Sequence, residues 1–95
     1  MFDQENQKIE TDNSLLILDD DEPFLRRLSK AMEKRGFKVF PANSIKELDR
    51  IIELNAPNYA VIDLRLSDGT GLDAIEKIKS RNKNSKIVVL TGYGA

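Results

Sequence analysis

The sequence of 95 residues contains no cysteine and no histidine. The lack of cysteine excludes disulfide bonds, thiolate nucleophiles and cysteine-ligated zinc sites. The lack of histidine removes imidazole bases and imidazole metal ligands, so acid–base, metal or nucleophilic chemistry must come from carboxylates, hydroxyl groups or lysines. No apolar run approaches the roughly 18–20 residues of a membrane span, and residues 1–13 lack the apolar core of a signal peptide. We therefore expect a cytoplasmic protein with no membrane partner.

Positive and negative charges are almost balanced, since 15 lysines and arginines face 16 aspartates and glutamates, for a formal net charge of -1. This balance leaves no basic stripe, so we expect that the chain itself does not bind nucleic acid. Its length fits one small domain. Residues 1–13 are polar and show no clear period. We predict a flexible N-terminal tail there and a domain at residues 14–95.

Four short apolar runs predict the strands of a parallel sheet. They lie at residues 15–18, 37–40, 59–64 and 86–90, and Pro41 closes the second. Alternation with helical patterns gives the order β-α-β-α-β-α-β, an α/β fold with helices on both faces of the sheet. The last run predicts a buried strand that forms a sheet edge with no covering helix. Such an edge favours a homodimer or an exchange of elements between copies.

Three amphipathic patterns between these runs predict helices. The first begins at Glu22-Pro23, where a proline is tolerated, and ends at Gly36, which adopts a left-handed conformation at little cost. The second begins at a capping box formed by Ser44 and Glu47, and the third follows a loop at residues 67–71. The apolar residues of these helical patterns are Leu25, Leu28, Ala31, Met32, Ile45, Leu48, Ile51 or Ile52, Leu54, Leu72, Ile75 and Ile78.

Acidic side chains and a hydroxyl group lie at the ends of three predicted strands. Asp19, Asp20 and Asp21 follow the first strand, Asp63 lies at the end of the third, and Thr91 follows the fourth. With the strand order 2-1-3-4, these groups meet in one crevice at the carboxyl ends of the strands, where open α/β sheets bind ligands. Two carboxylates about 4 Å apart repel by roughly 4 kcal/mol at a protein-like dielectric. A bound cation relieves this repulsion, and hard oxygen ligands favour Mg²⁺.

Each of these residues also has an ordinary structural interpretation. An aspartate at a strand end is often a helix cap, Asp21 favours the positive end of a helix, and Thr91 alone fits a turn hydroxyl. The agreement of three strand ends is stronger evidence for a site than any single residue. With a cation bound, one carboxylate in such a site can act as a nucleophile toward a phosphoryl group. The Thr91 hydroxyl and the Gly92 amide can then contact the remaining phosphoryl oxygens.

The segments around these residues resemble the receiver domain of two-component response regulators. The matching segments are residues 15–21 (LLILDDD), 61–66 (VIDLRL), 68–72 (DGTGL) and 87–92 (IVVLTG). Within receivers, residues 21–25, 63–66 and 90–94 resemble the redox-responsive RegA/PrrA/ActR type. The resemblance implies a flavodoxin-like, doubly wound sheet. It also implies a phosphoprotein of a phosphorelay that is not an enzyme and that belongs to a transcription regulator.

The resemblance also implies a role for individual residues. Asp63 matches the aspartate that accepts a phosphoryl group from a phosphohistidine of a sensor histidine kinase. Asp20 matches the main Mg²⁺ carboxylate, which Asp19 assists, and Asp63 and the backbone carbonyl of Arg65 complete the expected metal ligands. Thr91 matches the switch hydroxyl that moves toward the phosphoryl group. Gly92 matches the small residue that leaves room for the phosphoryl donor.

The sequence departs from the family pattern in two respects. Receivers commonly carry a proline four residues after the acceptor, where this chain has Ser67, and the change affects loop stiffness rather than chemistry. The match runs over residues 14–95, so we expect an incomplete receiver that lacks the last helix-strand-helix portion and the output helix-turn-helix region. The family's phosphoryl-binding lysine belongs to that portion, so no lysine of this chain takes its role. Such a chain is expected to bind Mg²⁺ weakly and to be phosphorylated poorly or not at all.

Two other functions fit parts of the sequence. A haloacid-dehalogenase-type phosphohydrolase would use Asp19 as nucleophile and Asp21 as acid–base, but it leaves Asp63 without a role. The position of an acyl phosphate distinguishes the two hypotheses, since it forms at Asp63 in a receiver and at Asp19 in the phosphohydrolase. A truncated interaction module would instead compete for a sensor kinase through its first helix, without phosphorylation. The basic residues of that helix are Arg26, Arg27, Lys30 and Lys34.

Overall fold

The structure, a computed structural model, describes residues 12–91. The predicted tail therefore lies outside the described residues except for its last two, which are hydrogen-bonded to the domain. The Asn58 side chain donates to the carbonyl of Asp12 at 2.9 Å, and the Lys38 amide donates to the carbonyl of Asn13 at 3.1 Å. The boundary at residue 14 stays a prediction.

The described chain folds into three helices and six strands in the following order. The elements are β1 (Ser14–Leu18), α2 (Glu22–Lys34), β2 (Lys38–Ala42), α3 (Ile45–Leu54), β3 (Tyr59–Asp63), β4 (Arg65–Leu66), β5 (Gly69–Thr70), α4 (Gly71–Arg81) and β6 (Lys86–Leu90).

Strand β1 lies inside a parallel sheet whose order is β2-β1-β3-β6. This is the predicted order 2-1-3-4, and it confirms the doubly wound α/β fold. The register pairs Leu18 with both Ala42 and Ile62, and it pairs Asp63 with Leu90. Because parallel strands end at the same edge of a sheet, the residues that follow β1, β3 and β6 come together at that edge.

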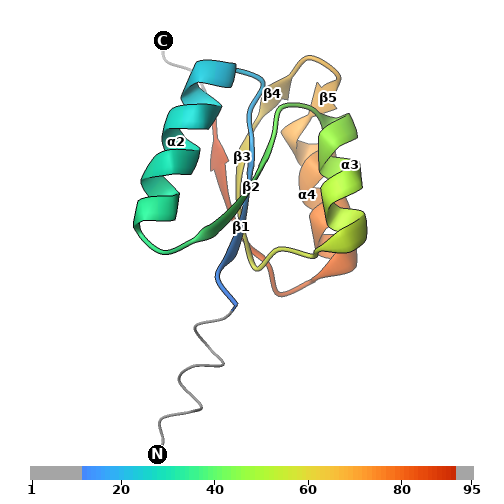
Figure 1. Cartoon of the computed structure of the whole chain (residues 1–95). Coiled ribbons are helices and arrows are strands. Elements are labelled where there is room, and N and C mark those ends of the chain that lie inside the picture. Colours follow the sequence, from blue (N-terminus) through green and yellow to red (C-terminus); the bar gives the residue numbers. More distant parts are fainter. Residues whose placement is uncertain (1–11, 92–95) are drawn as a thin grey trace, which may run out of the picture.

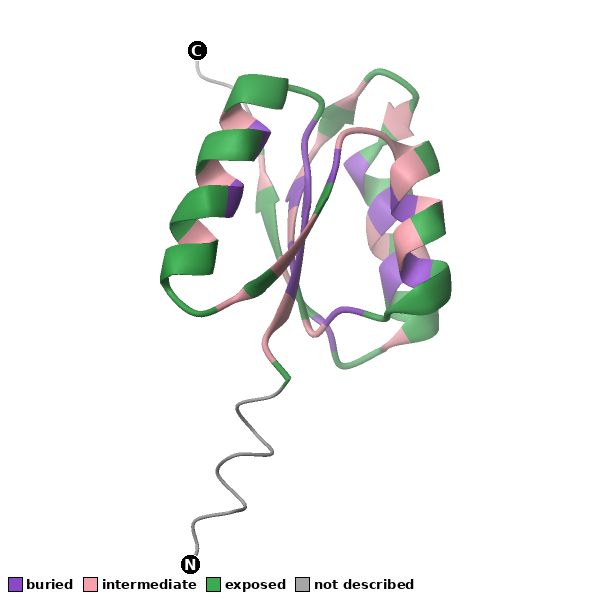
Figure 2. Cartoon of the chain, viewed as in Figure 1, coloured by how far each residue is buried: buried purple, intermediate pink, exposed green. Residues whose placement is uncertain are grey.

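Helices cover both faces of the sheet, with α2 on one face and α3 and α4 on the other (Figure 1). The strand β1 supplies both cores because its successive side chains point to opposite faces. Leu15 and Ile17 pack with Leu25 of α2, whereas Leu16 and Leu18 belong to the core beneath α3 and α4. Figure 2 shows β1 buried through most of its length, with the exposed residues on the outer sides of the helices.

The predicted signals at the helix ends are largely confirmed. Asp21 is the N-cap of α2 and accepts a hydrogen bond from the Phe24 amide at 3.2 Å. Gly36 follows that helix with a φ of +99°, the left-handed region in which a glycine costs least. The hydroxyl of Ser44 accepts from the Glu47 amide at 3.2 Å, which is one half of the predicted capping box.

The prediction that Pro41 closes the second strand is wrong, because β2 continues to Ala42. The Lys38 amide donates to Asn13, and the Ala42 carbonyl accepts from the Asp19 amide at 3.1 Å, so these residues face the neighbouring strand β1. Alternation along the strand then directs the backbone of Pro41 away from β1. Since β2 is an edge strand among the described residues, Pro41 removes a donor that none of the described strands needs, and it protects the edge from further pairing.

Other differences concern burial and the loop before α4. Ala31 is exposed because it lies beside the stripe of α2 that holds Leu25, and Leu54 is 84% exposed at the end of α3. Leu72, in the helical pattern of α4, is 64% exposed in the first turn. Among residues 12–91, β6 is an edge strand as predicted, but it is not buried throughout, since Val88 is 58% exposed. The predicted loop at 67–71 contains part of a small antiparallel hairpin, β4 with β5.

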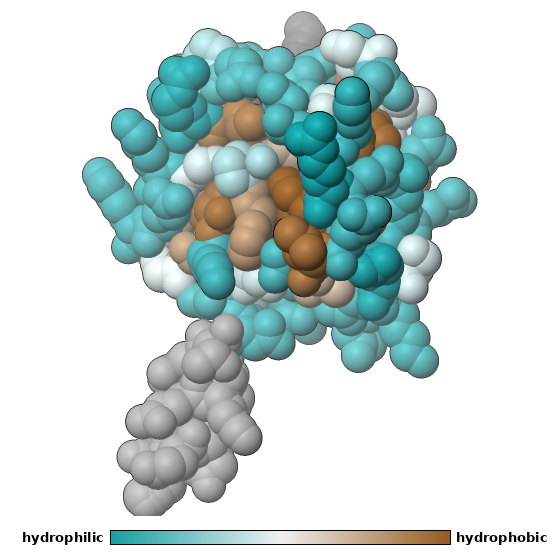
Figure 3. All heavy atoms as spheres, turned by 45° about the vertical axis from the view of Figure 1, so that its right-hand side comes forward, coloured by the Kyte–Doolittle hydropathy of each residue, from teal (hydrophilic) through white to brown (hydrophobic). Residues whose placement is uncertain are grey.

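The surface of the described part of the chain is mostly charged or polar. Figure 3 shows hydrophilic side chains over much of one face, with hydrophobic side chains gathered toward its middle. Among residues 12–91, no helix combines the length and the apolarity that crossing a membrane requires.

Candidate functional site

Three carboxylates gather at the carboxyl ends of β1 and β3. Asp19 and Asp20 directly follow β1, and Asp63 is the last residue of β3. One side-chain oxygen of each residue lies within 4.8 Å of the corresponding oxygen of the other two. The side chain of Asp19 is buried, that of Asp63 is half-buried, and that of Asp20 is exposed. The cluster therefore reaches from the sheet to the surface.

Burial and charge both act on the carboxyl group of Asp19. Burial raises the pKa of Asp19 most strongly, and the neighbouring charges of Asp63, Asp20 and Asp21 raise this pKa further. The Asp21 amide donates to Oδ1 of Asp19 at 2.9 Å and partly opposes the rise. The charged form of Asp19 is therefore disfavoured in the folded chain, which is a condition that a nearby cation relieves.

The donor set fits a small, hard cation. Mg²⁺ binds oxygen at about 2.0–2.1 Å, so two oxygens on one ion lie at most about 4.2 Å apart. The carboxylate oxygens of Asp19, Asp20 and Asp63 are separated by no more than 4.8 Å. Small side-chain movements thus bring all three within reach of one ion. Because carboxylates are hard oxygen ligands, the set suits Mg²⁺ or Ca²⁺ rather than a soft transition metal.

The hairpin that follows β3 contacts two of these carboxylates. The amide of Arg65, at the start of β4, donates to Oδ1 of Asp63 at 3.4 Å. Oδ2 of Asp20 accepts from the Ser67 amide at 3.1 Å and from the Ser67 hydroxyl at 2.9 Å. In the sequence, Ser67 stands out only as a departure from the family pattern. The contact between Ser67 and Asp20 spans 47 positions in the sequence, and no local pattern predicts it.

Thr91 lies one residue beyond β6. Its neighbour Leu90 pairs with Asp63, and the Leu90 carbonyl accepts from the Leu64 amide at 2.9 Å. Thr91 itself is exposed. Its backbone therefore lies at the same sheet edge as the carboxylates, as the strand order predicts. Gly92, the other residue expected to contact a phosphoryl group, lies outside the described residues.

Asp21 is engaged elsewhere. Its side chain caps α2 through the Phe24 amide, and it is not part of the three-carboxylate group found among residues 12–91. The ordinary interpretation of Asp21 as a helix cap therefore accounts for it. The phosphohydrolase hypothesis requires Asp21 to act on substrate as an acid–base, and this position of its side chain does not favour that role.

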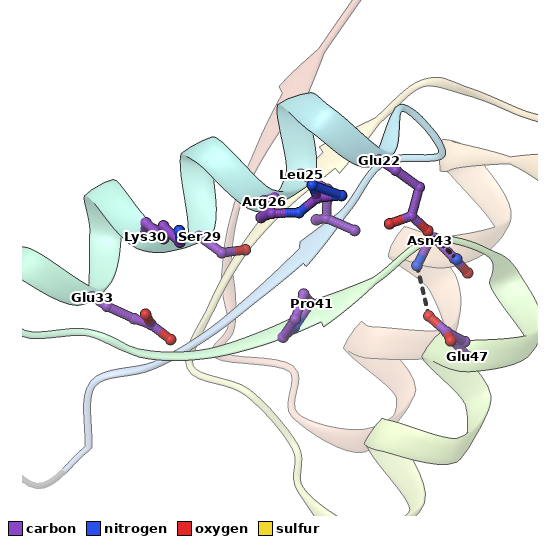
Figure 4. A pocket seen from close by; sticks show the side chains of 9 residues that line it. All are labelled: Glu22, Leu25, Arg26, Ser29, Lys30, Glu33, Pro41, Asn43 and Glu47. Atoms are coloured by element: carbon purple, nitrogen blue, oxygen red, sulfur yellow. Dashed lines mark hydrogen bonds between the residues drawn. The ribbon is translucent and has the colours of Figure 1, made fainter.

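A separate hollow of about 440 Å³ lies between α2, β2 and the start of α3 (Figure 4). Asn43 lies at one end of the hollow, where its side chain donates to Glu22 and its amide donates to Oε1 of Glu47 at 2.9 Å. The Ser29 hydroxyl also lines the hollow and is buried, with no hydrogen-bond partner among the described residues. None of the three clustered aspartates lines it. The hollow is thus a structural feature distinct from the acidic site.

Comparison with known proteins places the acidic site in a family context. Residues 15–95 match the family model described as response regulator receiver domain. The photosynthetic apparatus regulatory protein RegA of Cereibacter sphaeroides is 58% identical over 84 residues, which cover 88% of this chain and 46% of RegA. The acid tolerance regulatory protein ActR of Rhizobium meliloti is 57% identical over 83 residues, covering 87% of this chain and 43% of ActR. The chain thus spans about half the length of the curated relatives it matches.

Solved structures show the same fold. A response regulator protein from Burkholderia pseudomallei superposes with a TM-score of 0.81 at 30% identity, covering 88% of this chain and 49% of that protein. Its crystal structure contains a phosphorylated aspartic acid, a calcium ion and citrate.

Proposed function

The chain belongs to the response regulator receiver domain family, and we propose that Asp63 accepts a phosphoryl group from a phosphohistidine of a sensor histidine kinase. In this proposal Asp19, Asp20 and Asp63 bind the Mg²⁺ that the reaction uses. The observation that carries the proposal is the approach of these three carboxylates to within 4.8 Å. The similar Burkholderia pseudomallei protein, with its phosphorylated aspartic acid and calcium ion, supports the same chemistry.

The proposed step is a nucleophilic displacement at phosphorus. An oxygen of the Asp63 carboxylate forms the new bond to phosphorus, the bond from phosphorus to the imidazole nitrogen of the donor breaks, and that nitrogen keeps the electron pair. A bound Mg²⁺ supplies positive charge that offsets the charge of the phosphoryl oxygens and of the acceptor. Asp63 is suited to the attack because it is only half-buried, so a donor reaches it from solvent.

Other residues support this step in the proposal. The carbonyl of Arg65 is the backbone metal ligand, and the Arg65 amide already holds Oδ1 of Asp63 at 3.4 Å. The Thr91 hydroxyl and the Gly92 amide contact phosphoryl oxygens, and Thr91 moves as the switch. The position of Thr91 directly after β6, whose last residue pairs with Asp63, supports this assignment.

We propose a regulatory rather than an enzymatic role, because the RegA and ActR relatives are regulatory proteins. The partner is a sensor histidine kinase, and the exchange takes place in the cytoplasm as part of a transcription regulator. Any DNA contact belongs to an output domain rather than to this chain. The exposed basic residues on α2 offer a surface for an acidic face of the kinase. They are Arg26, Arg27, Lys30 and Lys34.

A metal titration tests the site first. Isothermal calorimetry or amide NMR shifts should detect Mg²⁺ binding to the wild-type chain. We expect Asp20→Asn to weaken this binding by at least about tenfold, because it removes a charged ligand. The matched control is Asp73→Asn, an exposed aspartate on α4 outside the cluster. Equal binding by the wild type and Asp20→Asn would overturn the site.

The acceptor is tested by locating the acyl phosphate. The chain is incubated with Mg²⁺ and a small acyl phosphate donor, then reduced with borohydride, which converts a phosphorylated aspartate to homoserine. Peptide mass spectrometry should place the label at Asp63, and Asp63→Asn should abolish it. A label at Asp19 would instead favour the phosphohydrolase. A label that Asp63→Asn leaves unchanged would contradict the proposed acceptor role.

A further inference from the structure

Resting on the proposed metal site, we propose that Ser67 is a positioning residue for that site. In this proposal its two donors hold one oxygen of Asp20 and leave the other oxygen directed to the cation. Ser67 also joins the metal site to the hairpin β4–β5, so cation binding and the position of this hairpin become coupled. The proposal follows from the hydrogen bonds of Ser67 and from how the hairpin is anchored.

Both donors of Ser67 reach the same atom. The Ser67 hydroxyl lies 2.9 Å from Oδ2 of Asp20, and the Ser67 amide lies 3.1 Å from that oxygen. An ionised carboxylate offers about four lone-pair sites on its two oxygens. Two hydrogen bonds therefore fill the sites of Oδ2, while no hydrogen bond among the described residues occupies Oδ1 of Asp20. This arrangement divides the carboxylate into a fixed oxygen and one that is available to a metal.

The need for such fixing follows from the exposure of Asp20. Asp19 is buried and is held by the Asp21 amide, and Asp63 is held by the Arg65 amide. Asp20 is exposed, so without a partner its side chain would sample several rotamers. Ordering an exposed carboxylate costs conformational entropy when the metal binds. Ser67 supplies that order before the cation arrives.

Ser67 is itself held in place from the other side of the hairpin. Ser67 and Asp68 form the turn between β4 and β5, whose residues Leu66 and Gly69 pair. The carboxylate of Asp68 accepts hydrogen bonds from two amides at the start of α3, those of Ile45 at 3.1 Å and Lys46 at 3.4 Å. Adjacent residues of one turn thus bind the metal site and the start of a helix. The turn cannot move away from Asp20 without loosening the contact with α3.

The test compares Mg²⁺ binding by the wild type, Ser67→Ala and Ser67→Thr. Loss of a hydrogen bond to a metal ligand typically weakens metal binding 10–100-fold. Because Ser67→Ala removes one of two bonds, we expect Mg²⁺ affinity to fall by about tenfold, at the lower end of that range. Ser67→Thr keeps the hydroxyl and should restore most of the affinity. Ser80→Ala is the matched control, since the Ser80 hydroxyl donates to the Lys77 carbonyl at 2.7 Å on the exposed side of α4.

A second readout separates positioning from a general loss of structure. In amide NMR spectra without metal, Ser67→Ala should shift the resonances of the hairpin and of Asp20 but leave those of α2 unchanged. Equal Mg²⁺ affinity for the wild type and Ser67→Ala, or tighter binding by the variant, would overturn the role of Ser67 and leave the metal site standing. No Mg²⁺ binding by the wild type would overturn the metal site and this proposal together.

Discussion

The carboxylate of Asp68 caps helix α3 through a contact that spans 23 positions of sequence. The amide of Ile45, the first residue of α3, donates to Oδ1 of Asp68 at 3.1 Å, and the Lys46 amide donates to Oδ2 at 3.4 Å. The hydroxyl of Ser44 takes the next amide, that of Glu47. The first three amides of α3, which have no partner within the helix, therefore all find side-chain acceptors.

Removal of the Asp68 carboxylate should weaken this cap. We expect Asp68→Ala to lower the free energy of unfolding by about 1 kcal/mol, because two helix amides lose a charged acceptor. Urea unfolding followed by circular dichroism measures this change. Glu76→Ala is the control for lost negative charge, since Glu76 is exposed on α4. A loss no larger than that of Glu76→Ala would contradict the capping role.

The raised pKa of Asp19 predicts how stability depends on pH without Mg²⁺. The folded state binds a proton at Asp19 more tightly than the unfolded state, whose value is near 3.8. Stability should therefore decline as the pH rises from below 3.8 through the raised folded pKa. Asp19→Asn removes this decline but keeps an acceptor for the Asp21 amide. We expect the variant to be more stable than the wild type at neutral pH, because burial and then repulsion by the neighbouring carboxylates disfavour the charge that the variant lacks. One such repulsive pair costs about 1 kcal/mol in water.

Unfolding in metal-free buffer across acidic to neutral pH measures the effect. The difference between Asp19→Asn and the wild type should be small at the acidic end and should grow with pH. Glu76→Gln provides the control for removal of a carboxylate outside the cluster. Saturating Mg²⁺ should reverse the order, because only the wild type keeps all three ligands. A wild type that gains stability with pH relative to Asp19→Asn in metal-free buffer would contradict the prediction.

The sequence predicts the strands of the sheet most clearly at β1. Its run from Leu15 to Leu18 is apolar throughout, which is the pattern of a strand buried on both faces. The helical spacing of apolar residues was less informative beside the buried stripe of α2 and at the end of α3, where Ala31 and Leu54 are apolar yet exposed. Hydrophobicity alone does not say where a helix runs past the sheet, so only packing decides the exposure of its ends.

The acidic cluster was also predictable, because it depends on strand ends and strand order alone. Asp19, Asp20 and Asp63 sit where two neighbouring parallel strands finish. The contacts of Ser67 and Asp68 were not predictable, because they depend on the path of a two-residue turn. Local sequence identifies a turn there, but it carries no information about which distant amide or carboxylate the turn will meet.

The buried hydroxyl of Ser29 offers a stabilising substitution. It has no hydrogen-bond partner among the described residues, and a buried polar group without a partner costs about 1–3 kcal/mol. Ser29→Ala also favours the helix. We expect this variant to gain about 1 kcal/mol of unfolding free energy, measured in urea. Ser80→Ala, at an exposed site in α4 where the hydroxyl has a partner, is the control for the same substitution in a helix. A Ser29→Ala variant less stable than the wild type would contradict the prediction.

Pairing of β6 between two copies of the chain stays a prediction, and the exposed residues of this strand allow it to be tested. Within residues 12–91, β6 is an edge strand of the sheet, with Val88 58% exposed. Exposed edge strands pair with other chains unless charge prevents it. Sedimentation velocity over a wide concentration range should show association of the wild type and a monomer for Val88→Lys. The control variant Leu54→Lys, changed at an exposed position of α3, should still associate. A wild type that stays monomeric at every concentration would contradict the prediction.

Gly71 allows helix α4 to begin directly against the end of β3, where Asp63 lies. A Cβ atom at position 71 would lie 2.7 Å from the Asp63 carbonyl oxygen and 2.9 Å from Cα of Leu64. Both are backbone atoms, so no side-chain rotation relieves the clash. We expect Gly71→Ala to cost about 1–3 kcal/mol of stability, although alanine is otherwise the better helix former.

The backbone shift that relieves this clash should also weaken Mg²⁺ binding, because the atoms that must shift belong to the strand end that positions Asp63. Leu72→Ala is the matched control, since Leu72 is the next residue of α4 and its side chain is 64% exposed. Urea unfolding and Mg²⁺ titration of both variants measure the two effects. If Gly71→Ala kept wild-type stability and Mg²⁺ affinity, close packing of α4 against β3 would not be what fixes Asp63, and its position would depend on the Arg65 amide instead.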